Sequence, residues 1–373
     1  MKFDYILNTL RLLSLTLPFV NGKAIDLKED ECDDIIKYLG NFNTYNDFLL
    51  FNEKEKICKV NDSGKVDYLD GSTEEQIEKL LSYDTITNLE YNVYYWDIYD
   101  YEEKPGKYLG ISPSILKLQN LEYLNINHYA TTNECSTSCP RYYLKKIEKG
   151  FLNNLNKLKT LKLHGVRISQ DNINEISQSK NLEELSFENC YLEDSIDYKP
   201  LKNLDKLSKM TIVESILGFA SFEYNTSFES INNLLNNIDG PLKELSLRSS
   251  NLSEIDIPSS IEKLCASFNG INSSNEDSID LRKSHKLKNI EFRYNPLMLS
   301  IYSHLSARLE FKLPTSNNIE TLKLSGVELS DEQMKEISFS SNLKELNCIN
   351  TVLYDISNNT EQSINQLKNL QSL

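Results

Sequence analysis

The segment LKTLKLHGVRI, residues 158–168, has leucines at its first, fourth and sixth positions and isoleucine at its eleventh. The alternation between the fourth and sixth positions predicts a short strand with one apolar face. A single short strand cannot bury that face alone, so similar strands must lie beside it. The fold therefore depends on whether the pattern recurs.

Copies of this pattern occur along most of the 373 residues. Clear copies start at Leu158, Leu182, Leu242, Leu287, Ile319 and Leu343, and weaker copies start at Ile86, Leu121, Leu207, Ile261 and, at the end of the sequence, Leu370. Stacked copies predict a parallel sheet whose inward side chains share one core. Each strand then needs a return path of about a dozen residues.

The pattern resembles the leucine-rich repeat, L-x-x-L-x-L-x-x-N-x-L, over roughly residues 86–373. The resemblance implies an α/β fold, a right-handed solenoid with a curved parallel sheet on its concave face. Asn269 and Asn295 match the asparagine position, where the family uses the side-chain amide to satisfy backbone groups of adjacent turns. Cys190 is a substitution that the family accepts there. Val166, Val327 and other residues replace the asparagine elsewhere, so we expect an irregular solenoid of about ten repeats, the last incomplete.

Repeat length predicts the return paths. Units near 24 residues can hold a helix on the outer face, and SDEQMKEIS at 330–338 predicts one, with Ser330 and Gln333 spaced as a capping box. The 19-residue unit from Leu242 to Ile261 predicts an extended or tight return, with which Pro258 is compatible.

A longer period is also present. TLKLHGVRIS at 160–169 is nearly repeated as TLKLSGVELS at 321–330, and NLEEL at 181–185 recurs as NLKEL at 342–346, each pair 161 residues apart. Two matches at one offset predict an internal duplication of a block of six units. No polar cap follows Leu353, so we expect either a longer chain or a last unit that pairs with another chain.

The N-terminal part lacks the repeat. Residues 1–22 predict a signal peptide cleaved after Gly22, with a buried or anchoring helix as the alternative. Residues 23–85 predict an N-terminal cap of helix, hairpin and helix, with the hairpin spanning 57–69. In this arrangement the cap covers the exposed edge of the first repeat.

Cysteines and sequons agree with secretion. In an oxidising compartment we expect two disulfides, Cys32–Cys58 and Cys135–Cys139. A metal half-site is the alternative for the second pair, but no His or Cys partner has suitable spacing. Candidate glycosylation sites are Asn61, Asn225, Asn251, Asn272 and Asn358.

Composition and motifs exclude several classes. The net charge of −15 argues against nucleic acid and against an anionic membrane surface. After residue 22 no segment approaches the ~20 apolar residues of a membrane span. The chain has four histidines and none of the phosphate-loop, dinucleotide or serine-elbow motifs, so we expect no catalysis, no cofactor and no metal.

The resemblance implies that polar residues between the core positions form the concave face. There we take Tyr123, His164, Arg248, Arg293 and Tyr294 as candidate binding residues, since Tyr and Arg are frequent in interface hot spots. Plain solvation of an exposed strand is the alternative for each.

The stretch YNVYYWDIYDYEEKPGKY at 91–108 contains the only tryptophan, Trp96, and is rich in tyrosine, including Tyr99. It predicts either an aromatic platform for sugar rings or a protein partner, or a small core packed over the cap.

We therefore expect a secreted or cell-surface recognition module that binds a protein or glycan partner through the concave face and inserted loops. An intracellular leucine-rich-repeat scaffold and a structural cell-wall or matrix adhesin are the alternatives. Since fold class does not determine function, the ligand does not follow from the sequence.

Overall fold

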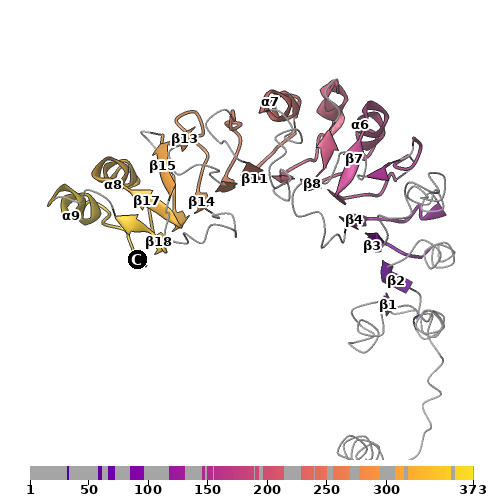
Figure 1. The fold of residues 1–373 in the computed structure, drawn as a ribbon, viewed down its shortest axis with the longest axis horizontal. Helices are drawn as coiled ribbons and strands as arrows, with labels where there is room; N and C mark the ends of the chain where they lie inside the picture. The colour runs from indigo at the N-terminus through magenta and orange to yellow at the C-terminus, as the bar shows by residue number, and fades with distance from the viewer. Residues whose placement is uncertain are drawn as a thin grey trace, which may run out of the picture.

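The structure, a computed structural model, describes residues 32, 58–60, 66–71, 85–95, 117–130, 145–147, 149–153, 155–188, 190–192, 196–213, 228–238, 240–249, 255–268, 277–294, 307–314, 318–353 and 358–372. Figure 1 shows that this part of the chain forms an arc. The strands of one long sheet follow the inner side of the arc, and the labelled helices lie along its outer side.

The long sheet has twelve strands in chain order, and every neighbouring pair from the second strand onward is parallel. Its strands are β1 (Cys58–Val60), β2 (Val66–Gly71), β3 (Asn88–Tyr95), β4 (Tyr123–Ala130), β6 (Thr160–His164), β8 (Glu184–Glu188), β10 (Lys209–Val213), β11 (Glu244–Ser249), β12 (Lys263–Phe268), β14 (Asn289–Tyr294), β16 (Thr321–Ser325) and β18 (Glu345–Ile349). Each new strand is therefore added beside the preceding one, as a solenoid requires.

The strands coincide with the predicted copies. From β3 to β18, each strand begins two residues after the first apolar position, as Thr160 does after Leu158. The ten first-position residues of these copies are at most 1% exposed. Register places equivalent apolar residues side by side, for example Leu161 beside Leu185. The predicted shared interior is confirmed.

A repeated hydrogen bond joins consecutive units where each strand begins. The backbone N–H groups of Lys159 and Thr160 both donate to the carbonyl oxygen of Glu122, at 2.7 and 3.0 Å. The arrangement recurs as far as Lys344, whose carbonyl oxygen accepts two N–H groups at 2.8 and 3.1 Å. The stack is thus held by backbone bonds as well as by its apolar interior.

Two shorter parallel sheets, which the sequence did not predict, contain second strands of the repeats. They are β5 (Lys145–Lys146), β7 (Val166–Ile168) and β9 (Tyr191–Leu192), and β13 (Asp277–Asp280), β15 (Ala307–Lys312), β17 (Val327–Leu329) and β19 (Val352–Leu353). Gly165 (φ 66°) joins β6 to β7, and Gly326 (φ 69°) joins β16 to β17. These left-handed conformations favour glycine.

The helices are α6 (Gln170–Ile176), the 3-10 helix η3 (Lys199–Asn203), α7 (Phe228–Asn236), α8 (Asp331–Ser338) and α9 (Asn358–Asn365). The predicted helix at 330–338 is confirmed as α8. Ser330 caps it, since its Oγ accepts the N–H of Gln333 at 3.3 Å. The reciprocal half of the predicted capping box is wrong, because the Gln333 Oε1 accepts the N–H of Phe311 at 3.1 Å.

The short unit behaves as expected in its described part. Between β11 and β12, residues 255–262 contain turns and neither a helix nor a strand. This agrees with the extended or tight return predicted around Pro258.

The duplication is also visible in the structure. The strands β6, β7, β8 and β9 and the start of helix α6 recur 161 residues later as β16, β17, β18, β19 and the start of α8. An ion pair between Lys162 and Glu184 at 3.5 Å recurs between Lys323 and Glu345 at 3.3 Å.

The asparagine position is filled in two ways. The Cys190 thiol donates to the carbonyl oxygen of Leu163, at 3.1 Å, and so bonds the backbone of the adjacent turn as the resemblance implied. Burial raises the pKa of this thiol to about 12, which keeps it protonated and able to donate. Val166 and Val327, which the pattern placed at the same position, are instead buried in the short sheets.

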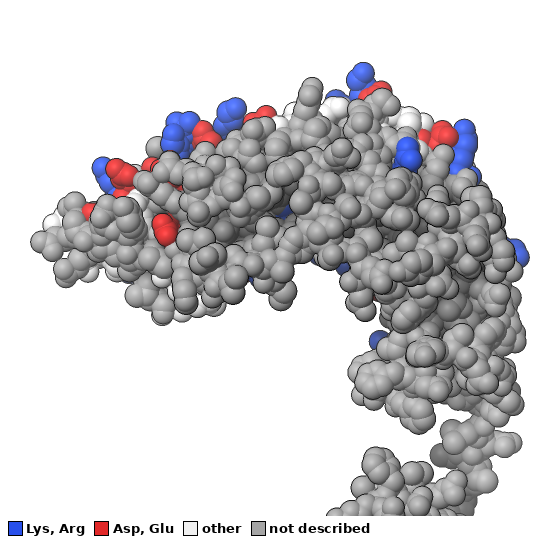
Figure 2. All heavy atoms as spheres, in the orientation of Figure 1, with Lys and Arg blue, Asp and Glu red and all other residues white. Residues whose placement is uncertain are grey.

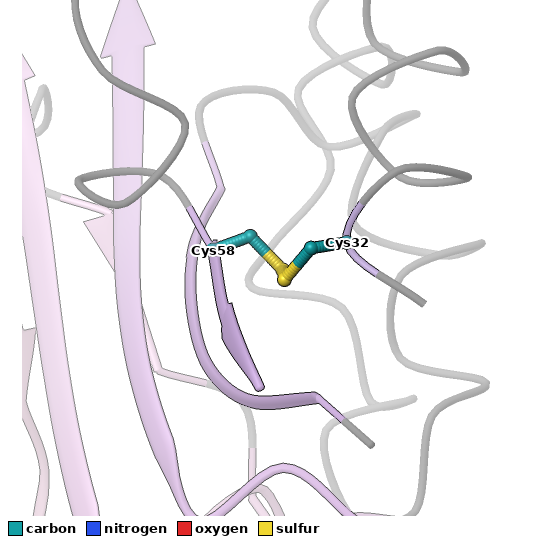
Figure 3. Close-up of a disulfide and its surroundings, with 2 residues drawn as sticks. All are labelled: Cys32 and Cys58. Carbon is teal, nitrogen blue, oxygen red and sulfur yellow. A yellow bond between two sulfur atoms is a disulfide. The ribbon is translucent and has the colours of Figure 1, made fainter. Parts of the chain in front are cut away.

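The N-terminal end of the sheet agrees with part of the prediction. The hairpin predicted over 57–69 is confirmed, since β1 and β2 pair antiparallel with Cys58 opposite Leu69. The predicted Cys32–Cys58 disulfide is also present (Figure 3). The signal peptide, most of both cap helices, and Cys135 and Cys139 lie outside the described residues. The complete cap therefore stays a prediction.

Candidate functional site

Strand alternation builds one continuous outward surface from the long sheet. On β6, Leu161 and Leu163 are buried, whereas Thr160, Lys162 and His164 are half-buried. We call the concave face the side chains at the first, third and fifth positions of β3 to β18. Since neighbouring parallel strands lie about 4.8 Å apart, these positions form three rows across the sheet.

A polar network connects the N-terminal half of the concave face. The Tyr123 hydroxyl donates to Glu90 Oε1 at 2.6 Å, and the Asn125 amide donates to the other oxygen of Glu90. The Lys162 Nζ lies 5.7 Å from the centre of the Tyr123 ring, within the range of a cation–π contact. Lys162 also pairs with Glu184 at 3.5 Å. Cross-strand contacts thus hold these side chains in defined positions.

The C-terminal half has separate ion pairs. Arg293 Nε donates to Glu291 Oε1 at 2.6 Å, and this hydrogen bond raises the pKa of the Arg293 guanidinium. Lys263 pairs with Glu244 at 3.3 Å across two neighbouring strands. Cys265, beside Glu291 in the third-position row, is half-buried.

The concave face is balanced in charge although the chain is acidic. Its described positions hold six carboxylates and six cations, against a net charge of −15 for the chain. They are Glu90, Glu184, Glu188, Glu244, Glu291 and Glu345, with Lys162, Lys209, Arg248, Lys263, Arg293 and Lys323. Because these charges balance, the concave face does not attract a strongly charged ligand over long distances.

A second set of charges runs along the edge where the strands begin. We call the rim ladder the alternating residues Lys243, Glu262, Lys288, Glu320 and Lys344, each of which directly precedes a strand. Lys288 contacts Glu262 at 2.8 Å, and Lys344 contacts Glu320 at 2.7 Å. These contacts lower the pKa values of Glu262 and Glu320. In Figure 2, Lys and Arg lie beside Asp and Glu along the outer outline of the arc.

Four of the predicted binding residues have described side chains on the concave face. Tyr123 joins the polar network, Arg293 pairs with Glu291, and His164 and Arg248 lie half-buried in the fifth-position row. They are spread over four strands and do not converge on one cluster. The structure describes only the backbone of Tyr294, at the end of β14.

Other candidate positions lie outside the described residues. They are Trp96, Tyr99 and the sequons at Asn61, Asn225, Asn251 and Asn272. The fifth sequon residue, Asn358, begins α9, and its side chain is not described.

Sequence reasoning missed the contribution of Glu90. It lies on the first repeat strand, in register with Asn125, and organises the network through both of its oxygens. The sequence did contain a signal for Glu90. It occupies the third position of its strand, which faces outward in every copy of the pattern.

Neither a membrane helix nor a metal site is found in the described segments. None of the helices in this part of the chain is long and apolar enough to cross a membrane. Within the same segments, no three His, Cys, Asp or Glu side chains lie close enough together to hold a metal ion.

Comparison with known proteins gives only remote similarity. No protein-family model and no curated protein sequence matches the chain. Among solved structures, it is similar to an internalin (inlF) from Listeria monocytogenes str. 4b F2365, with 14% identity, 82% of this chain and 79% of that chain covered, and a TM-score of 0.39.

Two larger proteins show comparable similarity. For the plant peptide hormone receptor RGFR1 in complex with RGF2, identity is 16%, coverage 85% of this chain and 51% of that chain, and the TM-score 0.34. For the TLR13–ssRNA13 complex, identity is 15%, coverage 82% and 49%, and the TM-score 0.36. The chain spans about half the length of these two proteins.

The fold is assigned from the chain's own architecture. A recurring leucine pattern, parallel strands added in chain order and a shared apolar interior together define the unit of a repeat solenoid. The chain has the leucine-rich-repeat fold.

Proposed function

We propose that the protein is a secreted or cell-surface recognition module that binds a protein or glycan partner through its concave face and inserted loops. The supporting observation is the ordered polar surface of the long sheet, where contacts such as Tyr123–Glu90 and Lys162–Glu184 fix side chains before any partner arrives. Side chains that are already ordered lose less conformational entropy on binding, which favours recognition.

Three features support a location outside the cell. Residues 1–22 resemble a signal peptide, the sequence contains five sequons, and Cys32 and Cys58 form a disulfide. Intact-mass measurement of the natural protein tests the location. We expect a chain that starts at Lys23 and carries sugar on some sequons. An unmodified chain that retains Met1 and has reduced Cys32 and Cys58 would favour the intracellular scaffold instead.

Binding without catalysis is supported by the way the charges are used. On the concave face, three of the six carboxylates and four of the six cations form ion pairs across neighbouring strands, as Lys209 and Glu184 do at 3.0 Å. An open sheet surface also lacks the dry surroundings that shift pKa values for acid–base chemistry.

The binding surface is tested with two matched double variants. Thr211→Trp with Ser246→Trp adds bulk at two half-buried positions in the middle of the concave face. Glu332→Trp with Lys335→Trp adds the same bulk at exposed positions on α8. The full chain and both variants are applied to a glycan array and to an array of secreted proteins, after thermal melting has verified that each is folded.

We expect at least one ligand that binds the wild-type chain and the α8 variant and is lost by the concave-face variant. Loss in the α8 variant with retention in the concave-face variant would contradict the proposal. A wild-type chain that binds nothing on either array would contradict it as well.

A further inference from the structure

Arg248, at the fifth position of β11, differs from the other cations of the concave face. The remaining five described lysines and arginines each lie within 4.0 Å of a carboxylate: Lys162, Lys209, Lys263, Arg293 and Lys323. Arg248 has no such partner among the described residues. Its Nε atom is buried and makes no hydrogen bond. The folded chain therefore holds a charged donor whose hydrogen-bonding capacity is partly unused.

An unused buried donor destabilises the folded state, because the group has lost water without gaining another acceptor. Arg248 as a whole is only half-buried, so a ligand oxygen can bond the guanidinium where it is accessible. A guanidinium also presents its donors in a planar fork that matches the two oxygens of a carboxylate. The geometry of the donor therefore selects for a planar anion.

The side chains around Arg248 are small or neutral. Val213 and Ser267 flank it in the fifth-position row. In the third-position row, Ser246 lies two residues before Arg248 on the same strand and has Thr211 and Cys265 on either side. None of these five neighbouring positions carries a long side chain, and three of them, Thr211, Ser246 and Ser267, carry a hydroxyl group. A main chain can approach such a surface and exchange hydrogen bonds with its hydroxyls.

The nearest charges in the fifth-position row are each two strands away, about 10 Å. On one side, Glu188 accepts a hydrogen bond from Ser186 at 2.7 Å. On the other side, Arg293 is bound by Glu291 at 2.6 Å. Within the described part of this row, neither strand next to Arg248 carries a charged side chain.

We propose that Arg248 binds a single carboxylate on an otherwise neutral, extended peptide segment of the partner protein. The inference rests on the proposed function and names the chemistry of its partner. One unpaired cation matches one negative charge. A polyanion would instead meet the six carboxylates of this face and the net charge of −15. The segment would lie across β10, β11 and β12, with its amides against Thr211, Ser246 and Ser267.

The probe is a pair of immobilised nonapeptide pools, randomised among neutral residues, with either Glu or Gln at the central position. Binding of the full chain to both pools is measured for the wild type, for Arg248→Gln, for Arg248→Lys and for Arg282→Gln. Arg282→Gln is the matched control, because it removes an exposed arginine that pairs with Asp280 at the end of β13. Thermal melting of each variant shows whether it is folded.

We expect the wild type to prefer the Glu pool by about tenfold or more, the effect of one charge-assisted contact. Arg248→Gln should abolish this preference without lowering the thermal midpoint, since no ion pair is lost and an unpaired buried donor is removed. Arg248→Lys should retain part of the preference, and Arg282→Gln all of it. Equal preference in the wild type and Arg248→Gln would overturn the inference, as would a wild type with no preference.

Two further measurements separate this inference from the proposed function. If the wild type binds both pools equally and the Thr211→Trp, Ser246→Trp variant binds neither, the concave face recognises peptides and the assignment of Arg248 is wrong. If that variant binds like the wild type, the proposal that the concave face is the binding surface is wrong. A third outcome is stronger binding to heparin or polygalacturonate than to the Glu pool, with this binding lost in Arg248→Gln. That result would show that Arg248 binds an acidic glycan and would overturn the proposal of a peptide ligand.

Discussion

The carboxylates of Glu175 and Glu336 make the same backbone contact 161 residues apart. Glu175 accepts the N–H of Leu152 at 3.1 Å, and Glu336 accepts the N–H of Leu313 at 3.2 Å. Glu175 accepts a second N–H, that of Gly150, at 2.6 Å. In the second block the corresponding N–H goes to a glutamine on α8. In both blocks the helix therefore binds two backbone N–H groups of the preceding segment. In the first block Glu175 accepts both, whereas in the second block Gln333 accepts one and Glu336 the other.

This difference predicts unequal stability effects. Glu175→Ala leaves two N–H groups without their acceptor and should lower the free energy of unfolding by about 2–3 kcal/mol, whereas Glu336→Ala should lower it by about 1–2 kcal/mol. Urea unfolding measures both values. Glu332→Ala, at an exposed position of α8, is the control and should change little. An effect of Glu336→Ala equal to or larger than that of Glu175→Ala would contradict the assigned contacts.

Gly165 and Gly326 provide a test of the junction between the long and short sheets. Their φ values of 66° and 69° are left-handed, so an alanine at either position should lower the free energy of unfolding by about 1–2 kcal/mol. Ser325→Ala, next to Gly326 at a position with ordinary backbone, should be nearly neutral. Glycine variants that match this control would show that the left-handed turn is not required.

Cys190 should resist alkylation in the folded protein. Burial raises its pKa to about 12, so almost none of it is thiolate at pH 8. Cys348 is exposed and should be labelled faster by iodoacetamide, although burial raises its pKa too. Peptide mass spectrometry gives both rates. Equal rates in the folded protein, differing from those in urea, would show that the Cys190 thiol does not bond to Leu163.

The rim ladder predicts a dependence of stability on pH. Lys288 and Lys344 lower the pKa values of Glu262 and Glu320, so these carboxylates stabilise the folded chain above their unfolded pKa of about 4.3. The contribution is lost as the pH falls through the lowered folded-state values. Thermal melting from pH 6 to pH 3 should therefore show a smaller decline for Glu262→Gln with Glu320→Gln than for the wild type.

Salt provides the control for this prediction. All four groups are partly exposed, so 1 M NaCl, with a Debye length of about 3 Å, should reduce the difference between the wild type and the double variant. A difference that is unchanged by salt would assign the effect to something other than these ion pairs.

The repeated strands could be predicted from the sequence because their spacing is local. The offset of two positions from Leu158 to Thr160 recurs between the first apolar position and the strand in each copy from β3 to β18, and burial of one face sets the alternation. The hairpin over 57–69 and the start of α8 followed from equally local turn and capping signals.

The remaining features depend on contacts between repeats. Val166 and Ile168 belong to a second sheet, but two apolar residues of a three-residue strand look like the end of the first strand's pattern. The tie from Glu175 to Leu152 joins a helix to a turn 23 residues earlier, and no spacing rule predicts it. Arg248 was a candidate by residue type alone. That it lacks a carboxylate partner among the described residues depends on which residues stand opposite it in register.

The fold and the proposed binding surface both require parallel strands that stack in register, with their polar side chains outward on the concave face. Ser246 and Cys265 are register partners at the third position of β11 and β12. Neighbouring strands lie about 4.8 Å apart, within the Cα separation that a disulfide spans. Glu244 is displaced from Ser246 by two residues along β11, about 6.6 Å, which is too far for its replacement to reach Cys265.

The most direct measurement is disulfide formation in Ser246→Cys after mild oxidation of the folded protein, read by peptide mass spectrometry, with Glu244→Cys as the control. We predict a disulfide to Cys265 in Ser246→Cys and little or none in Glu244→Cys. Efficient formation in Glu244→Cys together with none in Ser246→Cys would contradict the register, the concave face and the function proposed from them.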